Sequence, residues 1–493
     1  MFRGIHLLRL GGYGLCKYST KSRLSGEIMS KLKIETKVKP VLDPEFMPAV
    51  MWNRAFRSLC DANENAADLT IALSRPDGTV FVHKTKILPH EGDNIALNNK
   101  HVERLIKFLL WHKGGSTITI GGNDTIAQFI KDTYSPKGRQ AFDYDIMGKK
   151  MFLEPMKVIA CPIEEVPAPN EANIPLGRNL DGCRIGFDLG GSDRKAAALI
   201  DGEVVFSEEI KWNPYFEKNP DYHYDGIMDS LKRAAEKLPR VDAIGGSAAG
   251  DYVNNEVRVA SLFRGISEED FEKHVRRIFY RVKEAWNNIP FEVANDGEVT
   301  ALAGAMSLKD NAVLGISMGT SQAAGYCNPD GYITSWLNEL AFVPIDYRDD
   351  APADEWSGDI GCGVQYFSQQ GVARLAALAG IDLPKDMPLA ERLVRVQSLM
   401  KEGDERARKI YETIGVYFGY AIATYAEFYE IRNLLILGRV TSGEGGQVII
   451  EKAAETLEME FPALAKKIKM TTPDEQLKRH GQAIAAASLP KIS

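Results

Sequence analysis

The sequence predicts an α/β protein in which helices pack on mainly parallel sheets with antiparallel edge strands. From residue 183 onward, short apolar strand patterns alternate with amphipathic helical patterns, which is typical of this class. Several of those strands end in turns that contain glycine. A proline-rich stretch at 162–180 favours neither helix nor strand, so we interpret it as a linker from an earlier unit.

The composition is that of an ordinary globular protein. Of 493 residues, 44% are hydrophobic and 26% are charged, and this length predicts two to four domains. The net charge of -7 and the pI near 5.8 argue against a nucleic-acid partner. No apolar run approaches the roughly 18–20 residues of a membrane span, so we expect no membrane partner. Six scattered cysteines without a CxxC pair indicate reduced thiols.

Residues 1–28 differ from the rest of the chain. Up to residue 26 they include five Lys and Arg residues and no Asp or Glu. This composition is typical of a mitochondrial transit peptide. The alternative is an over-extended start, because Met29 is a second candidate initiator. We therefore expect a cytoplasmic protein, or a mitochondrial matrix protein if the transit peptide is genuine.

Residues 30–161 are predicted to form an N-terminal α/β extension of unknown role. It contains a hairpin over 68–88, a helix over 101–112 and a strand over 116–120. The hairpin faintly echoes a later one that follows Asp188, so a degenerate duplicate of the later fold is one interpretation.

The later region is organised around Arg184-Ile-Gly-Phe-Asp-Leu-Gly-Gly-Ser192. A strand delivers Asp188 to a turn with Gly190, Gly191 and Ser192, and a hairpin follows. The glycines let backbone N–H groups approach phosphate oxygens, and the carboxylate can hold a hydrated Mg²⁺. The stretch is neither a Walker A loop nor a Rossmann fingerprint, because no Gly-Lys-Ser/Thr follows and no helix comes next. Taken alone, it is equally compatible with a tight turn.

Four more strand ends carry polar or glycine residues, in a recognisable order. They are the turn at Gly250 after strand 241–246, Asn295-Asp296 after strand 291–294, Gly319-Thr320-Ser321 after strand 312–318, and Gly438 after strand 434–437.

This series resembles the actin-like ATPase and sugar-kinase superfamily, and more narrowly the ROK family (repressors, open reading frames and kinases). The resemblance covers roughly residues 183–490. It implies a duplicated, ribonuclease H-like fold with one lobe at 183–310, a second at 311–490, and a cleft between them. It also implies ATP and Mg²⁺ as cofactors and a sugar-like small molecule as acceptor. A homodimer is left open.

The resemblance implies a role for each matching residue. Phosphoryl transfer needs positioned phosphates and a base for the acceptor hydroxyl. Asp296 would be that base, and Asp188 would organise Mg²⁺ through water. The acceptor would contact Asn295, Glu339 and Gly250. The ATP phosphates would lie against Gly190, Gly191, Ser192, Gly319, Thr320 and Ser321, and adenosine against Gly438.

The acceptor side departs from the family pattern. The family's Gly-Glu-x-Gly-His motif reads Asn-Glu-Leu-Ala-Phe at 338–342, which keeps Glu339 but has Phe342 for His. Its Cys-x-Cys-Gly-x-x-Gly-Cys-x-Glu motif keeps only Cys362 of three cysteines and has Val364 for Glu. One cysteine cannot assemble a tetrahedral zinc site, so we expect no zinc. Phe342 and Val364 are expected to make one wall of the acceptor pocket apolar.

A carbohydrate kinase that uses ATP is the leading hypothesis. A ROK-type sensor that binds a sugar or nucleotide is one alternative, supported by the altered acceptor motifs. An actin-like ATPase that acts on a protein partner is another. The joint presence of Asp188 and Asp296 favours the kinase.

Overall fold

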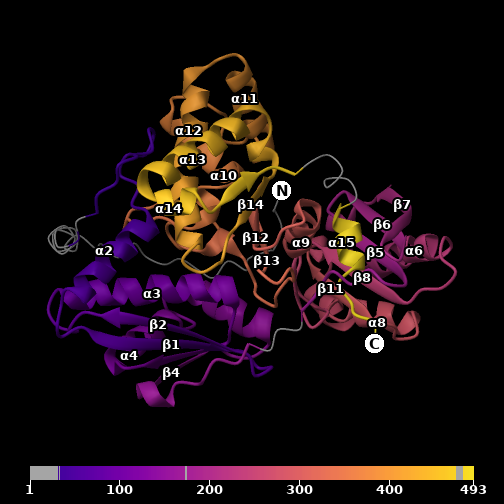
Figure 1. The fold of residues 1–493 in the computed structure, drawn as a ribbon, viewed down its shortest axis with the longest axis horizontal. Helices are drawn as coiled ribbons and strands as arrows, with labels where there is room; N and C mark the ends of the chain where they lie inside the picture. The colour runs from indigo at the N-terminus through magenta and orange to yellow at the C-terminus, as the bar shows by residue number, and fades with distance from the viewer. Residues whose placement is uncertain (1–31, 33, 172–174, 474–480, 493) are drawn as a thin grey trace.

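The computed structural model describes residues 32, 34–171, 175–473 and 481–492. They form three α/β units, each with its own main sheet (Figure 1). The segment 1–28, expected to be a transit peptide or an over-extended start, lies outside the described residues. Within the described ranges, no helix has the length and apolar character needed to cross a membrane.

The N-terminal unit contains a four-stranded sheet in the order β2-β1-β3-β4. β1 pairs antiparallel with both β2 and β3, and β3 pairs parallel with β4. The strands are β1 (Ala67–Ser74), β2 (Val80–Ile87), β3 (Thr117–Gly121) and β4 (Lys157–Cys161). The helices are α2 (Ala49–Asp61), α3 (Asn94–Lys113), α4 (Asp124–Thr133), α5 (Ala141–Asp143) and the π-helix η1 (Tyr144–Phe152).

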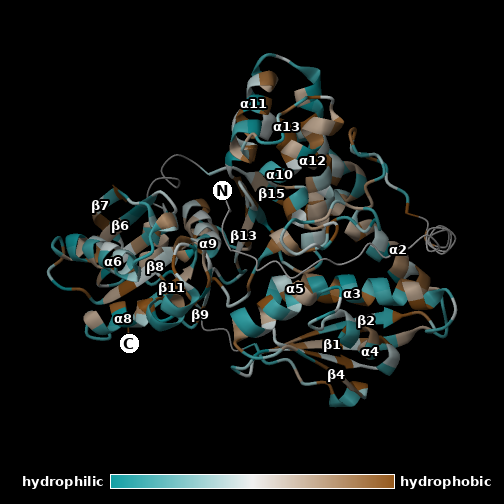
Figure 2. Ribbon diagram, turned by 180° about the vertical axis from the view of Figure 1, so that it is seen from behind, coloured by the Kyte–Doolittle hydropathy of each residue, from teal (hydrophilic) through white to brown (hydrophobic). Residues whose placement is uncertain are grey.

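Helix α3 is the centre of this unit. Every residue from His101 to His112 is buried, because the helix lies between its own sheet and the second lobe (Figure 1). A helix that is buried on all sides belongs to a core. Figure 2 shows that α6 (Pro220–Ala235), on the first lobe, carries mostly hydrophilic residues.

The first lobe has a five-stranded sheet in the order β11-β8-β5-β6-β7. Its strands are β5 (Cys183–Leu189), β6 (Asp193–Ile200), β7 (Glu203–Lys211), β8 (Ala243–Ala248) and β11 (Phe291–Asn295), with a separate hairpin of β9 (Asp251–Val253) and β10 (Glu256–Val259). Its other helices are α7 (Glu268–Asp270), the π-helix η5 (Phe271–Val275), α8 (Ile278–Ala285) and α9 (Asp296–Leu308). Ser267 and Asp270 form a Ser-x-x-Asp capping pattern ahead of apolar residues at helical spacing, which predicts one long capped helix. Ser267 does cap α7, accepting from the Asp270 N–H at 3.1 Å, but π-helical η5 interrupts that helix.

The second lobe has a four-stranded sheet in the order β13-β12-β14-β15. Its strands are β12 (Val313–Met318), β13 (Gln322–Cys327), β14 (Asn433–Leu437) and β15 (Lys469–Thr471). Its helices are α10 (Gln369–Leu378), α11 (Leu389–Lys401), α12 (Glu405–Tyr425), α13 (Gly443–Glu460) and α14 (Pro462–Ala465). Short 3₁₀ turns elsewhere are η2 (Ile163–Glu165), η3 (Pro214–Phe216), η4 (Ser261–Phe263), η6 (Leu340–Phe342), η7 (Gly363–Gln365) and η8 (Arg439–Thr441).

The two lobes repeat one strand arrangement. In each, the first strand forms a hairpin with the second and pairs parallel with a later strand, which pairs parallel with a last one. This repeat confirms the predicted duplicated two-lobe fold. The N-terminal sheet does not follow it, since β1 and β3 are antiparallel. That difference argues against the N-terminal unit being a third copy.

The last helix departs from the predicted boundary of the second lobe at 311–490. Helix α15 (Gln482–Ala487) packs on the first-lobe sheet, where Ala483 and Ala487 contact Ala197 and Leu199. A Cβ on Gly186 would come within 1.7 Å of the Ala483 carbonyl oxygen. Small residues on both elements therefore allow the chain to return to the first lobe.

The N-terminal unit shares its hydrophobic core with the second lobe. One cluster of buried residues includes Ile106 and Leu109 of α3 together with Leu340 and Val343. The unit is thus packed into the fold, although the sequence predicted only a linked extension.

Candidate active site

Two glycine-containing turns occupy equivalent places in the two lobes, between the first strand and its hairpin partner. The Gly190 N–H donates to the Asp193 carbonyl at 2.9 Å, and the Gly319 N–H donates to the Ser321 carbonyl at 2.9 Å. A Cβ on Gly319 would meet only the Ser321 carbonyl oxygen, at 3.6 Å, so there is open space beside this backbone. Such space suits the close approach of a phosphate group.

The other predicted phosphate-binding residues lie in or beside these turns. A Cβ on Gly191 would come within 1.9 Å of the Tyr215 hydroxyl, so packing also requires this glycine. The Ser192 hydroxyl donates to Asp193 at 2.8 Å, and Thr320 is half-buried.

Gly438 lies against the second turn from the neighbouring strand. Its φ is 105°, and a Cβ would come within 2.4 Å of the Met318 carbonyl oxygen, one residue before Gly319. The structure thus brings Gly438 and Gly319 together.

Asp188 is a buried carboxylate at the end of β5. The Ser247 hydroxyl donates to it at 2.7 Å, and the Lys195 ammonium lies 3.8 Å away. Burial raises the pKa of Asp188 to about 6, the Ser247 hydrogen bond and Lys195 oppose the rise, and the charge of Asp296 adds to it. Asp188 of β5 and Ala294 of β11 both stand opposite Ser247 of β8, so Asp188 and Asp296 lie at the same end of the sheet, one strand apart.

Asp296 begins α9, directly after β11. Burial raises its pKa, and the Gly297 N–H partly offsets the rise. The preceding Asn295 has both ends of its side chain engaged, since it accepts from the Gly297 N–H at 2.7 Å and donates to the Gly250 carbonyl at 2.8 Å. Asn295 is thus a helix cap that fixes the Gly250 turn, which differs from the substrate contact expected for it.

A pair of hydrogen-bonded carboxyl groups lies near Asp296. Asp251 follows Gly250, and its side chain shares a hydrogen bond with Glu339. Burial raises the pKa of Glu339, and the neighbouring charge of Asp251 raises it further. A hydrogen bond between two carboxyl groups requires a proton on one of them, so the pair shares a proton. Sequence reasoning missed Asp251, although a carboxylate beside a glycine turn at a strand end is the signal that identified Asp188.

Phe342 and Val364 were expected to form an apolar wall of the acceptor pocket, but both side chains pack against other parts of the protein. The Phe342 ring stacks on Trp111 of α3 with centroids 4.1 Å apart. Val364 is buried beside Ala341 and Cys362. Val364 is thus buried, whereas Phe342 is half-buried and faces the N-terminal unit, which has no counterpart in the family motifs. Among the described residues, no three His, Cys, Asp or Glu side chains are arranged to ligate a metal ion.

The duplicated lobes with their paired glycine turns have the fold of the actin-like ATPases. No protein-family model and no curated relative matches this chain. ROK-family proteins are among its structural neighbours. A ROK hexokinase from Thermus thermophilus is 17% identical, with 62% of this chain and 97% of that chain covered and a TM-score of 0.49. A ROK glucokinase from Streptomyces griseus, solved with glucose and AMPPNP, is 18% identical over 62% and 98%, with a TM-score of 0.44. A ROK transcriptional regulator, a homolog of the E. coli MLC protein, is 18% identical over 62% and 78%, with a TM-score of 0.47.

Proposed function

We propose that this protein transfers a phosphoryl group from ATP to a hydroxyl of a sugar or sugar-like small molecule. The observation that carries the proposal is the proximity of Asp188 and Asp296 at the ends of β5 and β11, in a fold that repeats the glycine turn in both lobes. Phosphoryl transfer requires positioned phosphates, a metal-organising carboxylate and a base. These residues can supply all three.

The residues present fit Mg²⁺ and ATP. Carboxylate oxygen is a ligand type that Mg²⁺ prefers, usually with several waters retained, and Asp188 offers it at the base of the first turn. The open backbone at Gly319 leaves room for phosphate oxygens. Gly190, Gly191, Ser192, Thr320 and Ser321 would line the phosphates, and Gly438 would lie along adenosine. When bound, Mg²⁺ and ATP supply charge neutralisation and the transferable phosphoryl group.

Asp296 would accept the proton of the acceptor hydroxyl at its carboxylate. A general base works best when its pKa lies near the working pH, and burial raises the pKa of Asp296 in that direction. Asn295 would hold Asp296 in position by capping α9 and fixing the Gly250 turn. Asp251 and Glu339 would orient the acceptor, since a carboxyl pair offers both a donor and acceptors to sugar hydroxyls.

The test is ADP release by the full chain with Mg-ATP and a panel of hexoses, amino sugars, N-acetylated sugars and polyols. We expect release that depends on one acceptor. Asp296→Ala should abolish it while a fluorescent ADP analogue still binds, and Asp330→Ala, on an exposed turn, should behave as wild type. An unchanged rate in Asp296→Ala would refute the assignment of the base. If no acceptor in the panel supports ADP release and nucleotide still binds, the result would favour a ROK-type sensor or an ATPase that acts on a protein partner.

A further inference from the structure

The N-terminal unit contacts the acceptor side of the candidate site through the last turn of α3. The Glu339 N–H donates to the Trp111 carbonyl at 2.9 Å, and the Asn338 N–H donates to the His112 carbonyl at 3.0 Å. The last four carbonyls of a helix have no partner inside the helix. Here the segment that carries Glu339 supplies partners for two of them.

Aromatic side chains reinforce this contact on both flanks. Phe342, three residues beyond Glu339, stacks on Trp111 at 4.1 Å. On the other flank, the His112 ring meets Trp336 edge-on at 4.9 Å and lies 4.3 Å from the Tyr429 ring. Residues 336–342 are therefore fixed to α3 by rings as well as by backbone hydrogen bonds.

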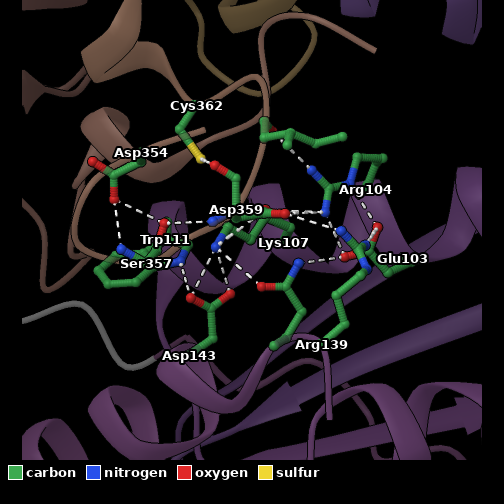
Figure 3. Close-up of polar contacts among 12 residues, drawn as sticks. Glu103, Arg104, Lys107, Trp111, Arg139, Asp143, Asp354, Ser357, Asp359 and Cys362 are labelled. Carbon is green, nitrogen blue, oxygen red and sulfur yellow. Dashed lines mark hydrogen bonds and ion pairs between the residues drawn. The ribbon is translucent and has the colours of Figure 1, made fainter. Parts of the chain in front are cut away.

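A cluster of charged side chains, buried except for the exposed Arg139, anchors the following segment to the same helix (Figure 3). Asp359 lies 3.0 Å from Arg104 and 3.5 Å from Lys107, and Lys107 also pairs with Asp143 at 2.8 Å. Arg139 contacts Asp359 at 2.9 Å and Glu103 at 2.6 Å. Three cations thus balance three carboxylates, so the cluster is neutral. It joins the N-terminal unit to the segment where the sequence has only one of the family's cysteines.

The contact continues from α3 to the helix that carries Asp296. Asn338 is fully buried, with a φ of 53°, and its side-chain N–H donates to Glu298 on α9. The Tyr429 hydroxyl donates to the Asn338 side-chain oxygen at 2.6 Å. Glu298 is two residues beyond Asp296, so Asn338 links α3 to the base.

We propose that the N-terminal unit is a positioning element of the acceptor site, in which α3 holds Glu339 in register with Asp251 and Asp296. The assignment of an acceptor site rests on the proposed function, whereas the contacts between α3 and residues 336–342 do not depend on it. Loosening α3 from residues 338–342 should impair acceptor binding and leave nucleotide binding intact. Residues 34–161 would then act on specificity without touching the acceptor.

The test compares two matched substitutions in the full chain. Phe342→Ala removes the stack on Trp111, and Phe428→Ala removes an equivalent stack of a half-buried ring on Phe108 of α3, at 4.0 Å. Hydrogen–deuterium exchange of peptides that cover 337–342 reports directly on the two backbone hydrogen bonds. We expect exchange there to rise about tenfold or more in Phe342→Ala and to change little in Phe428→Ala. Unchanged exchange, or an equal rise in both variants, would overturn the proposal.

Steady-state kinetics give a second measurement, because a merely structural role would not raise KM for the acceptor selectively. With the acceptor that supports ADP release, Phe342→Ala should raise KM for the acceptor roughly tenfold, with kcat and affinity for a fluorescent ADP analogue near wild type. Equal losses in acceptor and nucleotide binding would contradict a positioning role. Because the exchange measurement needs no turnover, it decides the proposal even if the wild type proves inactive on the whole panel.

Discussion

Replacing Glu298 with glutamine tests whether this side chain is neutral in the folded protein. Glu298 is 4% exposed, and burial raises its pKa from 4.5 to about 8, with the Asn338 amide and the Tyr326 N–H opposing the rise. In the unfolded chain the carboxyl is ionised from about pH 7 to pH 9, whereas the folded protein releases this proton within that range. Because the folded-state pKa is raised, the contribution to stability is present at low pH and is lost as pH rises through about 8.

The size of the effect follows from linkage. Integrating proton release around this pKa, from about pH 7 to pH 9, costs the wild type about 1.4 kcal/mol of folding free energy. The glutamine side chain cannot titrate and can accept the same hydrogen bond from Asn338, so the Glu298→Gln variant should match the wild type near pH 7 and lack this loss.

The assay is thermal unfolding of both proteins near pH 7 and near pH 9. For a cooperative unit of roughly 150–250 residues, the wild-type transition should fall by about 3–5 °C more than that of the variant. Other titrating groups are common to both proteins and cancel in the comparison. Parallel shifts in the two proteins, or a large loss in the variant near pH 7, would show that Glu298 is ionised in the folded state.

Three further outcomes are expected. Lys107→Met should destabilise the protein by about 3–5 kcal/mol, because Asp143 and Asp359 lose a buried cation, whereas Lys100→Met, at a more exposed ion pair, should cost about 0–1 kcal/mol in the same denaturation assay. Gly438→Ala combines backbone strain of about 1–3 kcal/mol with a clash, so it should lose binding of a fluorescent ADP analogue. Binding that matches the wild type would rule out the proposed contact between Gly438 and adenosine. Metal analysis of purified protein should find no stoichiometric zinc, and one zinc per chain would show that the 355–364 segment is misaligned with the family motif.

Local patterns located the strands and turns that carry the family resemblance, and the resemblance implied the duplicated fold. A strand shows as a short apolar run and a glycine turn as a break in it, and both signals lie within a few neighbouring residues. The turns after Asp188 and Met318 were therefore found in the right order, and so was Asp296 at a strand end. Capping chemistry is equally local, which is why Ser267 was identified correctly. The π-helical break after α7 was missed because no local residue marks it.

What the sequence determined by itself was the order of strands, turns and candidate carboxylates, because these depend on neighbours along the chain. Only the tertiary structure decided what those residues contact. Phe342 was expected in the acceptor pocket and instead stacks on Trp111, and Glu339 pairs with Asp251. The return of α15 to the first lobe likewise depends on glycine and alanine residues far apart in sequence. Contacts between such distant residues arise from packing and from the pairing of buried charges, and these leave no periodic signal in the sequence.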